Sequence, residues 1–329
     1  MTFSSRVSGR RRHLGWGWLK AKGPRAVWAV MRTVMFAGLC FMILYPVLMI
    51  LTRSFMAAED MSDSSVVLFP KHLSLDTLSL AAGMLDYGKS LAITLAVVLT
   101  VTGLQTFVCL MVGYGFGRYE IPCRNLLFAL VIFTIVVPPQ LYMSSMYLHF
   151  KDFDILGLIR LIRGEPLHLV NTYAPLYLLS LTASGIKNGL FIYIFRQNFR
   201  NMPGEIEEAA FVDGAGHFCI FTRIMIPNAT ATIVTVALFS FVWVYNDNVV
   251  SGMLLGDANL LSIKYLSVAE VTSLILKDYG VPDALSYNPM YILALKSAAV
   301  LLIIAPLVLL YLALQRFFVD SVERAGLVG

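Results

Sequence analysis

The sequence predicts an all-α membrane protein whose chain crosses the bilayer about six times. Three observations lead to this fold class. The chain of 329 residues is 58% hydrophobic, only 14% of its residues are charged, and its mean hydropathy is +0.75. The apolar residues are gathered into long blocks, and most of the charges lie between these blocks. Soluble domains are about one quarter charged, so this composition excludes an ordinary globular domain.

Each apolar block is long enough to cross the hydrocarbon core as a helix, which takes roughly 17–25 residues. A helix is the expected form, because lipid offers no hydrogen-bond partner to a bare backbone amide. Pro138 and Pro139 interrupt the third block, and Lys187 and Asn188 fall within the fourth, so we expect kinks or a bordering cavity at both places. The predicted spans are Val34–Leu51, Leu91–Gly117, Leu126–Tyr147, Ala174–Phe195, Ala229–Val250 and Met290–Phe317.

The distribution of Lys and Arg predicts that both chain termini are cytoplasmic. Segments on the side of the N-terminal tail carry roughly twice as many Lys and Arg residues as the opposite loops, and cytoplasmic segments hold this excess in membrane proteins. An even number of spans requires the same placement. The net charge of +5 therefore needs no nucleic acid to explain it, because a basic tail with tryptophans suits the surface of a lipid membrane.

Four segments follow from these spans. They are a basic cytoplasmic tail (1–33), the first transmembrane helix with an external loop (34–89), a transmembrane core (90–317) and a short cytoplasmic tail (318–329). Within the core, a short external helix is expected around Ser262–Lys277. Loops as long as the external ones usually have a function, so we expect them to receive a partner from outside the cell.

The loop between the fourth and fifth spans is the most informative segment. Pro203 and Gly204 break the chain before a short helix near 205–214. Glutamates crowd the first turns of this helix, where carboxylates oppose the positive end of the helix dipole, and two alanines keep one face thin. Gly214 suits the left-handed residue that ends a helix, and Pro227 then begins the fifth span. From spacing alone, an amphipathic connector between two membrane helices is the simpler interpretation.

The same segment resembles the EAA signature of ABC importer permeases. That signature is E-A-A, three residues, G, nine residues and I-x-L-P, and this chain departs from it only with Ile226 in place of leucine. In that family the helix docks into a cleft on a cytoplasmic ATPase subunit. The resemblance implies the architecture of a type I ABC importer permease, and it assigns coupling to the ATPase to Glu205, Glu208, Ala209, Ala210, Gly214, Ile224 and Pro227.

Other segments resemble the carbohydrate-type branch of these permeases, which includes the maltose-system inner-membrane proteins. They include Val137–Gln140, Phe195–Phe199 and Tyr245-Asn246-Asp247, the last of which stands where those proteins usually show Trp-Asn-Asp. The stretch Ile159–Glu165 is an apparent insertion relative to them. The resemblance implies a sugar or oligosaccharide as substrate. It also implies three kinds of partner: an external solute-binding protein, a second related permease subunit and a pair of ATPase subunits.

We expect no catalytic residue, cofactor or metal in this chain. It has no GxxxxGK[ST] phosphate-binding loop, so ATP must be bound by the separate ATPase subunits. Asn246, Asp247 and Lys187 are candidates for the substrate path, because ionisable residues at membrane depth usually face a cavity or a partner. Asp247 has two structural alternatives, which are pairing with Lys187 and capping a helix break. A non-sugar solute is the alternative substrate, and a secondary transporter, which would show internal repeats, is the competing class.

Overall fold

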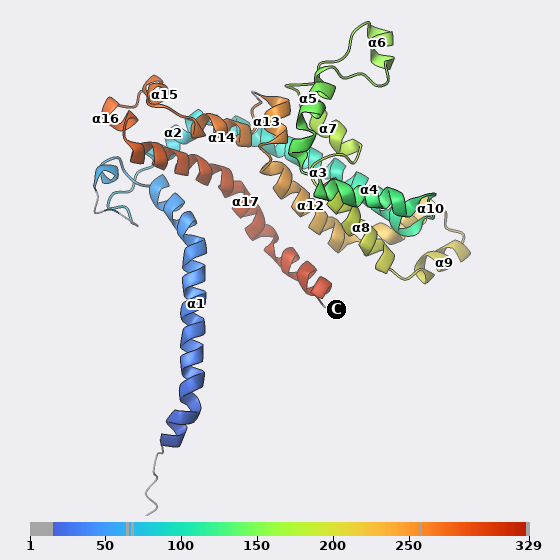
Figure 1. The fold of residues 1–329 in the computed structure, drawn as a ribbon, viewed down its shortest axis with the longest axis horizontal. Helices are drawn as coiled ribbons and strands as arrows, with labels where there is room; N and C mark the ends of the chain where they lie inside the picture. The colour runs from blue at the N-terminus through green and yellow to red at the C-terminus, as the bar shows by residue number, and fades with distance from the viewer. Residues whose placement is uncertain (1–15, 64–65, 67–68, 257, 327–329) are drawn as a thin grey trace, which may run out of the picture.

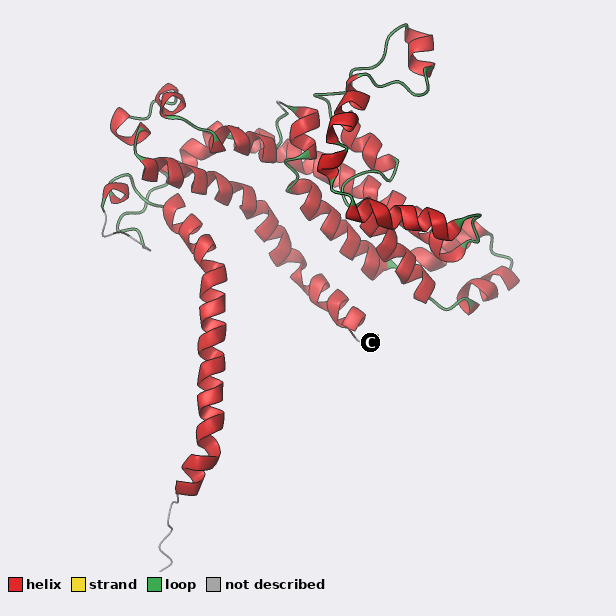
Figure 2. Cartoon of the chain, in the orientation of Figure 1, coloured by secondary structure: helices red, strands yellow, loops and turns green. Residues whose placement is uncertain are grey.

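The structure, a computed structural model, describes residues 16–63, 66, 69–256 and 258–326. These residues form helices and loops with two isolated β-bridges and no strand, which confirms the all-α fold class (Figure 2). The predicted tails lie partly outside the described residues, at 1–15 and 327–329. Where they are described, both tails continue the neighbouring helix, which begins at Trp16 at one end of the chain and ends at Gly326 at the other.

Three helices are long and apolar enough to cross a membrane unbroken, among the residues that the structure describes. They contain the first, second and last predicted spans. Their bounds are Trp16–Ser54 for α1, Tyr87–Arg118 for α3 and Pro289–Gly326 for α17. Figure 1 shows that α1 meets the start of α17 at one end and diverges from the rest of the molecule toward the other.

The third and fourth predicted spans are broken at the two places where the sequence indicates kinks. The third consists of α4 (Arg124–Val136), a 3₁₀ turn η2 (Pro139–Leu141) and α5 (Met143–Lys151). The fourth consists of α7 (Ala174–Leu181) and α8 (Asn188–Asn201). Pro138 and Pro139 end α4 because proline has no N–H and restricts the residue before it. The count of six spans stays a prediction, since neither pair is a continuous membrane-length helix.

The fifth predicted span begins and ends at different residues from those expected. Its helix, α12, covers Thr230–Tyr245 and not Ala229–Val250. Pro227 does not begin it but lies in the helical segment 217–228, which meets α12 at a bend of 75°. That segment consists of α10 (His217–Ile220), a π-helical turn η3 (Phe221–Met225) and α11 (Ile226–Asn228). A proline and a π-helical turn are both known causes of sharp helix bends.

The remaining short helices lie in loops predicted to be external or to follow the fourth span. One helix was expected around Ser262–Lys277, and the structure forms two, because the chain leaves the helical path between residues 269 and 273. The helix α6 occupies the apparent insertion and projects from the body of the molecule (Figure 1). These helices are η1 (Asp60–Ser62), α2 (Asp76–Met84), α6 (Leu158–Arg163), α9 (Glu205–Val212), α13 (Val250–Leu255), α14 (Leu261–Ala269), α15 (Ser273–Asp278) and α16 (Asp283–Ser286).

The helices α3 and α8 pack at unusually close range near the ends that the sequence predicts to be cytoplasmic. A Cβ atom added to Gly113 would lie 2.4 Å from the Cβ of Phe195, and one added to Gly117 would lie 3.1 Å from the Cβ of Phe199. Two glycines four residues apart lie on the same face of a helix and allow a neighbouring backbone to approach. Phe195 and Phe199 are fully buried there, in the apolar cluster on which α9 is built.

Candidate functional site

The short cytoplasmic helix predicted near 205–214 is present as α9, and Gly214 ends it. Gly214 has a φ of +82°, which an L-residue adopts only under strain. The N–H of Gly214 donates to the carbonyl of Phe211 at 3.0 Å, and the N–H of Ala215 donates to the carbonyl of Ala210 at 2.9 Å. These two hydrogen bonds form the Schellman motif, in which a left-handed glycine satisfies the last free carbonyls of a helix.

The helix α9 has an outer face and an inner face. The outer face consists of Glu205, Glu208, Ala209 and Val212, which follow the i, i+3, i+4, i+7 spacing of one side of a helix. All four are exposed, and Val212 is the most exposed large apolar residue of the helix at 89%. Ala210 points the other way and is buried in the cluster formed with α3 and α8. The alanine pair of the signature is therefore divided between the two faces.

Glu207 anchors the inner face of α9 to the end of α3. The hydroxyl of Tyr114 donates to Glu207 Oε1 at 2.9 Å, and Arg118 Nε lies 3.3 Å from Glu207 Oε2. Both charged side chains are only 14% exposed. Arg118 Nη2 also donates to the carbonyl of Met202 at 2.7 Å, so it holds the turn that precedes α9 as well.

The sequence placed Glu207 among the glutamates of the first turns but did not assign it a role, whereas it assigned coupling to Glu205 and Glu208. The three glutamates have the same side chain and lie in the same turns. Only the way α9 is rotated against α3 shows which one faces the bundle. The partner residues lie about 90 positions earlier in the chain, so no local spacing could reveal the contact. An Arg at the end of a predicted span was the available signal, because such a cation needs a carboxylate or a carbonyl when it is partly buried.

The signature residues after α9 lie on the path from α9 to α12. Ile224 is half-buried within the π-helical turn, and Pro227 is exposed just before the 75° bend. Between them, Met225 is 1% exposed and packs in the same cluster as Ala210. A displacement of α9 would therefore reach α12 through packed side chains, since interiors are dense and transmit strain.

The three candidates for the substrate path lie at helix ends. Asp247 accepts hydrogen bonds from the N–H and the hydroxyl of Ser251 at 2.7 Å each, and one from the N–H of Val250 at 3.2 Å, so it caps α13. Asn246 is exposed, and its amide donates to a carbonyl of α12. Lys187, also exposed, precedes α8, and its Nζ lies 5.8 Å from the centre of the Trp243 ring. Within the described residues, Asp247 forms no ion pair with Lys187.

A buried polar network closes the break between α7 and α8. Gln105 of α3 is fully buried, and its amide donates to the carbonyl of Ile186 and to the side-chain oxygen of Asn188. The hydroxyl of Ser240 donates to Gln105 Oε1 at 2.7 Å. Non-helical backbone is tolerated at membrane depth only where protein groups satisfy it. A single glutamine in a strongly apolar block gave no sign of this role in the sequence.

Among the residues that the structure describes, no group of three or more His, Cys, Asp or Glu side chains is arranged to hold a metal ion. The polar side chains of α9 and of the three substrate-path candidates take part in hydrogen bonds, helix capping and ion pairs.

Comparison with known proteins gives one family and several relatives. The model of the family described as binding-protein-dependent transport system inner membrane component matches residues 109–324. The arabinooligosaccharides transport system permease protein AraQ of Halalkalibacterium halodurans is 26% identical over 90% of this chain and 95% of its own. The melibiose/raffinose/stachyose import permease protein MelC of Bacillus subtilis is 27% identical over 86% and 91%.

A solved structure shares the fold. It is described as a bacterial ABC transporter involved in the import of the acidic polysaccharide alginate, and the matched chain superimposes with a TM-score of 0.67 at 17% sequence identity. The match covers 89% of this chain and 97% of that one. This chain therefore has a fold that is already known from experiment.

Proposed function

Because this chain belongs to the binding-protein-dependent transport system inner membrane components, we propose that it carries a sugar or oligosaccharide across the membrane. The chain is a permease subunit of an ABC importer. Importers of this family work with ATPase subunits and a solute-binding protein. The sugar assignment is supported by the substrates named for AraQ and MelC.

The outer face of α9 docks on the ATPase subunit. The observation that carries this proposal is the division of α9 into an anchored face and an exposed one. Glu207 and Ala210 hold the helix on the bundle, while Glu208 and Val212 extend away from it. Exposed acidic and apolar side chains on one short helix suit a basic-rimmed apolar cleft. ATP binding would pull α9, and the segment 217–228 would pass the displacement to α12.

The remaining coupling residues have supporting roles in this proposal. Gly214 fixes the length of α9, Ala209 lets the partner surface come close, and Glu205 adds negative charge at the start of the helix, where the dipole favours it. Ile224 and Pro227 shape the link to α12. ATP hydrolysis then belongs to the partner subunits, and this chain has no enzymatic activity of its own.

The substrate path passes the ends of α12 and α8, where Asn246, Asp247 and Lys187 lie. Exposed amide and ammonium groups can hydrogen-bond sugar hydroxyls, and Lys187 lies beside the ring of Trp243, a flat apolar surface of the kind on which a sugar stacks. Asp247 has a structural role first, because it caps α13. We expect Asp247→Asn to lower uptake through a loosened α13, whereas Lys187→Gln should raise the KM for the sugar and leave protein abundance unchanged. A Lys187→Gln variant with unaltered uptake kinetics would remove that residue from the path.

Both termini are cytoplasmic in the proposed membrane orientation, with segments 1–33, 34–89, 90–317 and 318–329 as the functional divisions. The cell membrane surrounds the chain with lipid, and a second, related permease completes the pathway as a heterodimer. The proposed contacts with lipid and with a second permease are supported by α1, whose most hydrophobic stretch has no buried residue in this chain. Such a helix faces lipid, a partner subunit or both.

Reconstitution tests the proposal. The chain, its neighbouring permease, the ATPase and the solute-binding protein are assembled in proteoliposomes, and uptake of labelled arabinooligosaccharides and raffinose is measured with and without ATP. We expect ATP-dependent uptake that is lost in Glu208→Arg/Val212→Asp, while the binding protein still retains sugar. Uptake driven by an ion gradient without ATP would indicate the secondary-transporter class, and ATP-driven uptake of a non-sugar solute alone would contradict the sugar assignment.

A further inference from the structure

A groove of about 440 Å³ lies between α1 and α17 at the end of the molecule predicted to be external. Its walls are one face of each helix, with Tyr265 of α14 at the side. On α17 the lining residues include Lys296 and Val300, and on α1 they include Met49 and Arg53. The volume lies within the range of 300–1,000 Å³ that is usual for small-molecule sites.

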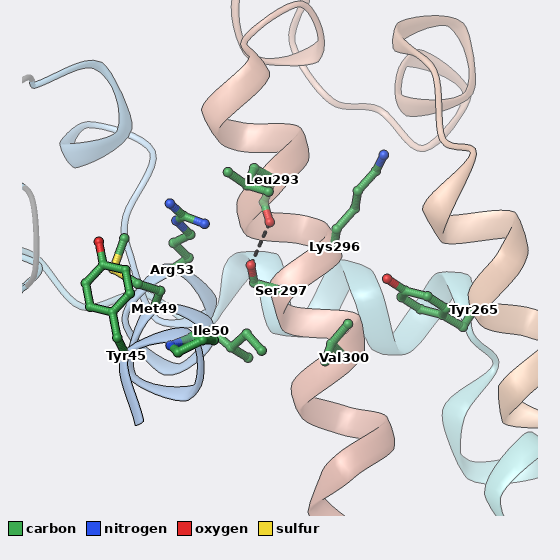
Figure 3. Close-up of a pocket in the computed structure, with 10 residues that line it drawn as sticks. Tyr45, Met49, Ile50, Arg53, Tyr265, Leu293, Lys296, Ser297 and Val300 are labelled. Carbon is green, nitrogen blue, oxygen red and sulfur yellow. Dashed lines mark hydrogen bonds between the residues drawn. The ribbon is translucent and has the colours of Figure 1, made fainter. Parts of the chain in front are cut away.

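Two cations in this groove have no acidic partner. Arg53 and Lys296 are both half-buried, and neither takes part in an ion pair within the described part of the chain. Half-buried charges are costly unless a counter-ion compensates them. Figure 3 shows the guanidinium of Arg53 and the ammonium of Lys296 extending toward the same end of the groove, on either side of Leu293. The rim of the groove therefore carries two positive charges, one on each helix.

Polarity changes along the groove with depth. Arg53 lies in the last turn of α1, and the lining residues of α1 reach back eight positions to Tyr45, which at 1.5 Å per residue is about 12 Å of depth. Below the cations the walls are mostly apolar, with Met49 and Ile50 on α1 and Val300 on α17. The polar side chains among them are Tyr45 and Ser297, and the hydroxyl of Ser297 donates to the carbonyl of Leu293 at 2.8 Å. A charged rim above an apolar trough matches a molecule with an anionic head and a hydrocarbon tail.

We propose that this groove binds an anionic phospholipid of the outer leaflet, with its phosphate at the rim that carries Arg53 and Lys296 and the start of an acyl chain along Ile50 and Val300. Long basic side chains near helix ends normally extend toward headgroups, and two of them on facing helices form a site where one would give only a general attraction. The lipid fills the wedge where α1 leaves α17, and so it sets the angle at which α1 crosses the membrane. A helix of the second permease is the competing occupant, and it would have to bring acids to this depth.

The test measures lipid retention by the assembled transporter. The complex is extracted into nanodiscs that contain equal amounts of phosphatidylglycerol and phosphatidylcholine, and the lipids that stay bound after release from the disc are counted by native mass spectrometry. We expect the wild type to retain phosphatidylglycerol, and Arg53→Gln/Lys296→Gln to retain at least tenfold less of it. Lys89→Gln is the matched control, because Lys89 is a cation in the first turn of α3, on the side of the membrane where the groove is predicted to lie, but it does not line the groove. This variant should retain lipid like the wild type.

Three results would overturn the inference. They are equal retention by the double variant and the wild type, no preference for phosphatidylglycerol, and a disulfide between Val300→Cys and a cysteine in the second permease. Such a disulfide would place a helix of that subunit where the acyl chain is proposed to lie. Melting temperatures of the double variant and the Lys89→Gln control show whether the complex is intact. Because retention is counted without transport, its failure leaves the importer assignment untouched.

Discussion

Replacing Glu207 with alanine should release α9 from the bundle. The substitution removes a carboxylate that accepts a hydrogen bond from the Tyr114 hydroxyl at 2.9 Å and lies 3.3 Å from Arg118 Nε. The side chains of Glu207 and Arg118 are each 14% exposed. A hydrogen bond to a charged group contributes about 1.5–3 kcal/mol, and breaking a buried ion pair costs about 3–5 kcal/mol. Arg118 keeps its bond to the Met202 carbonyl, so we estimate a loss of about 3 kcal/mol. That corresponds to a roughly 150-fold shift toward undocked α9.

Amide hydrogen exchange of segment 203–216 in the reconstituted transporter measures this shift. Glu207→Ala should raise exchange across α9 and uncouple ATP hydrolysis from uptake. Glu205→Ala is the matched control on the same helix, because Glu205 is exposed and has no partner in α3. It should raise exchange far less than Glu207→Ala, because it removes only a surface charge and no contact with α3. Unchanged exchange in Glu207→Ala, or equal effects of the two substitutions, would refute the claim that α9 is held on one face only.

Other predictions follow from the same contacts. Gly214→Ala should cost about 1–2 kcal/mol in the docked helix because of its φ of +82°, seen as faster amide exchange at the end of α9, whereas Gly204→Ala, with open space around it, should not. Gly113→Ala should lower the free energy of unfolding by about 1–3 kcal/mol, measured by thermal denaturation in detergent, because its Cβ would overlap α8; an unchanged melting temperature would contradict the close packing. In the loop predicted to be external, Asp60 accepts two backbone N–H bonds and contacts His72, which lowers the pKa of Asp60 below 3.8 and raises the pKa of His72 above 6.5. The stabilisation from His72 is complete below pH 6.5 and is lost as the pH rises through the raised pKa of His72. The stabilisation from Asp60 is complete above pH 3.8 and is lost as the pH falls through the lowered pKa of Asp60. Amide protection of residues 56–63 and 69–73 should therefore be greatest between pH 3.8 and pH 6.5, and His72→Asn should abolish only the alkaline loss.

The fold class and the position of α9 could be predicted from sequence because both depend on local signals. Apolar blocks of membrane length predict helices, and Gly214 ends α9 where the spacing placed it. The kinks at Pro138 and near Lys187 were also visible, since a proline and a charge each disturb a membrane helix locally. The exact ends of the fifth span were not, because the π-helical turn before Pro227 shifts the start of α12 to Thr230.

What the sequence could not show depends on contacts between distant residues. Glu207 differs from Glu208 only in the direction it faces, and that direction is set by the packing of α9 on α3. Gln105 became recognisable as a structural residue only when the break at Ile186 was seen to lie beside it. The sequence left Asp247 to the substrate path, to pairing with Lys187 or to capping a helix break, and the hydrogen bonds to Ser251 show the cap.

Site-specific photocrosslinking tests the central claim, that the outer face of α9 is where the ATPase acts on this chain. A benzophenone side chain is introduced at Val212, which is 89% exposed, and separately at Ile162 of α6, which is 82% exposed on the opposite, predicted external side. In the purified transporter, irradiation should crosslink the Val212 position to the ATPase subunit. The Ile162 position should give no crosslink to the ATPase subunit. An ATPase crosslink from Ile162, or none from Val212 in an ATP-hydrolysing complex, would contradict it.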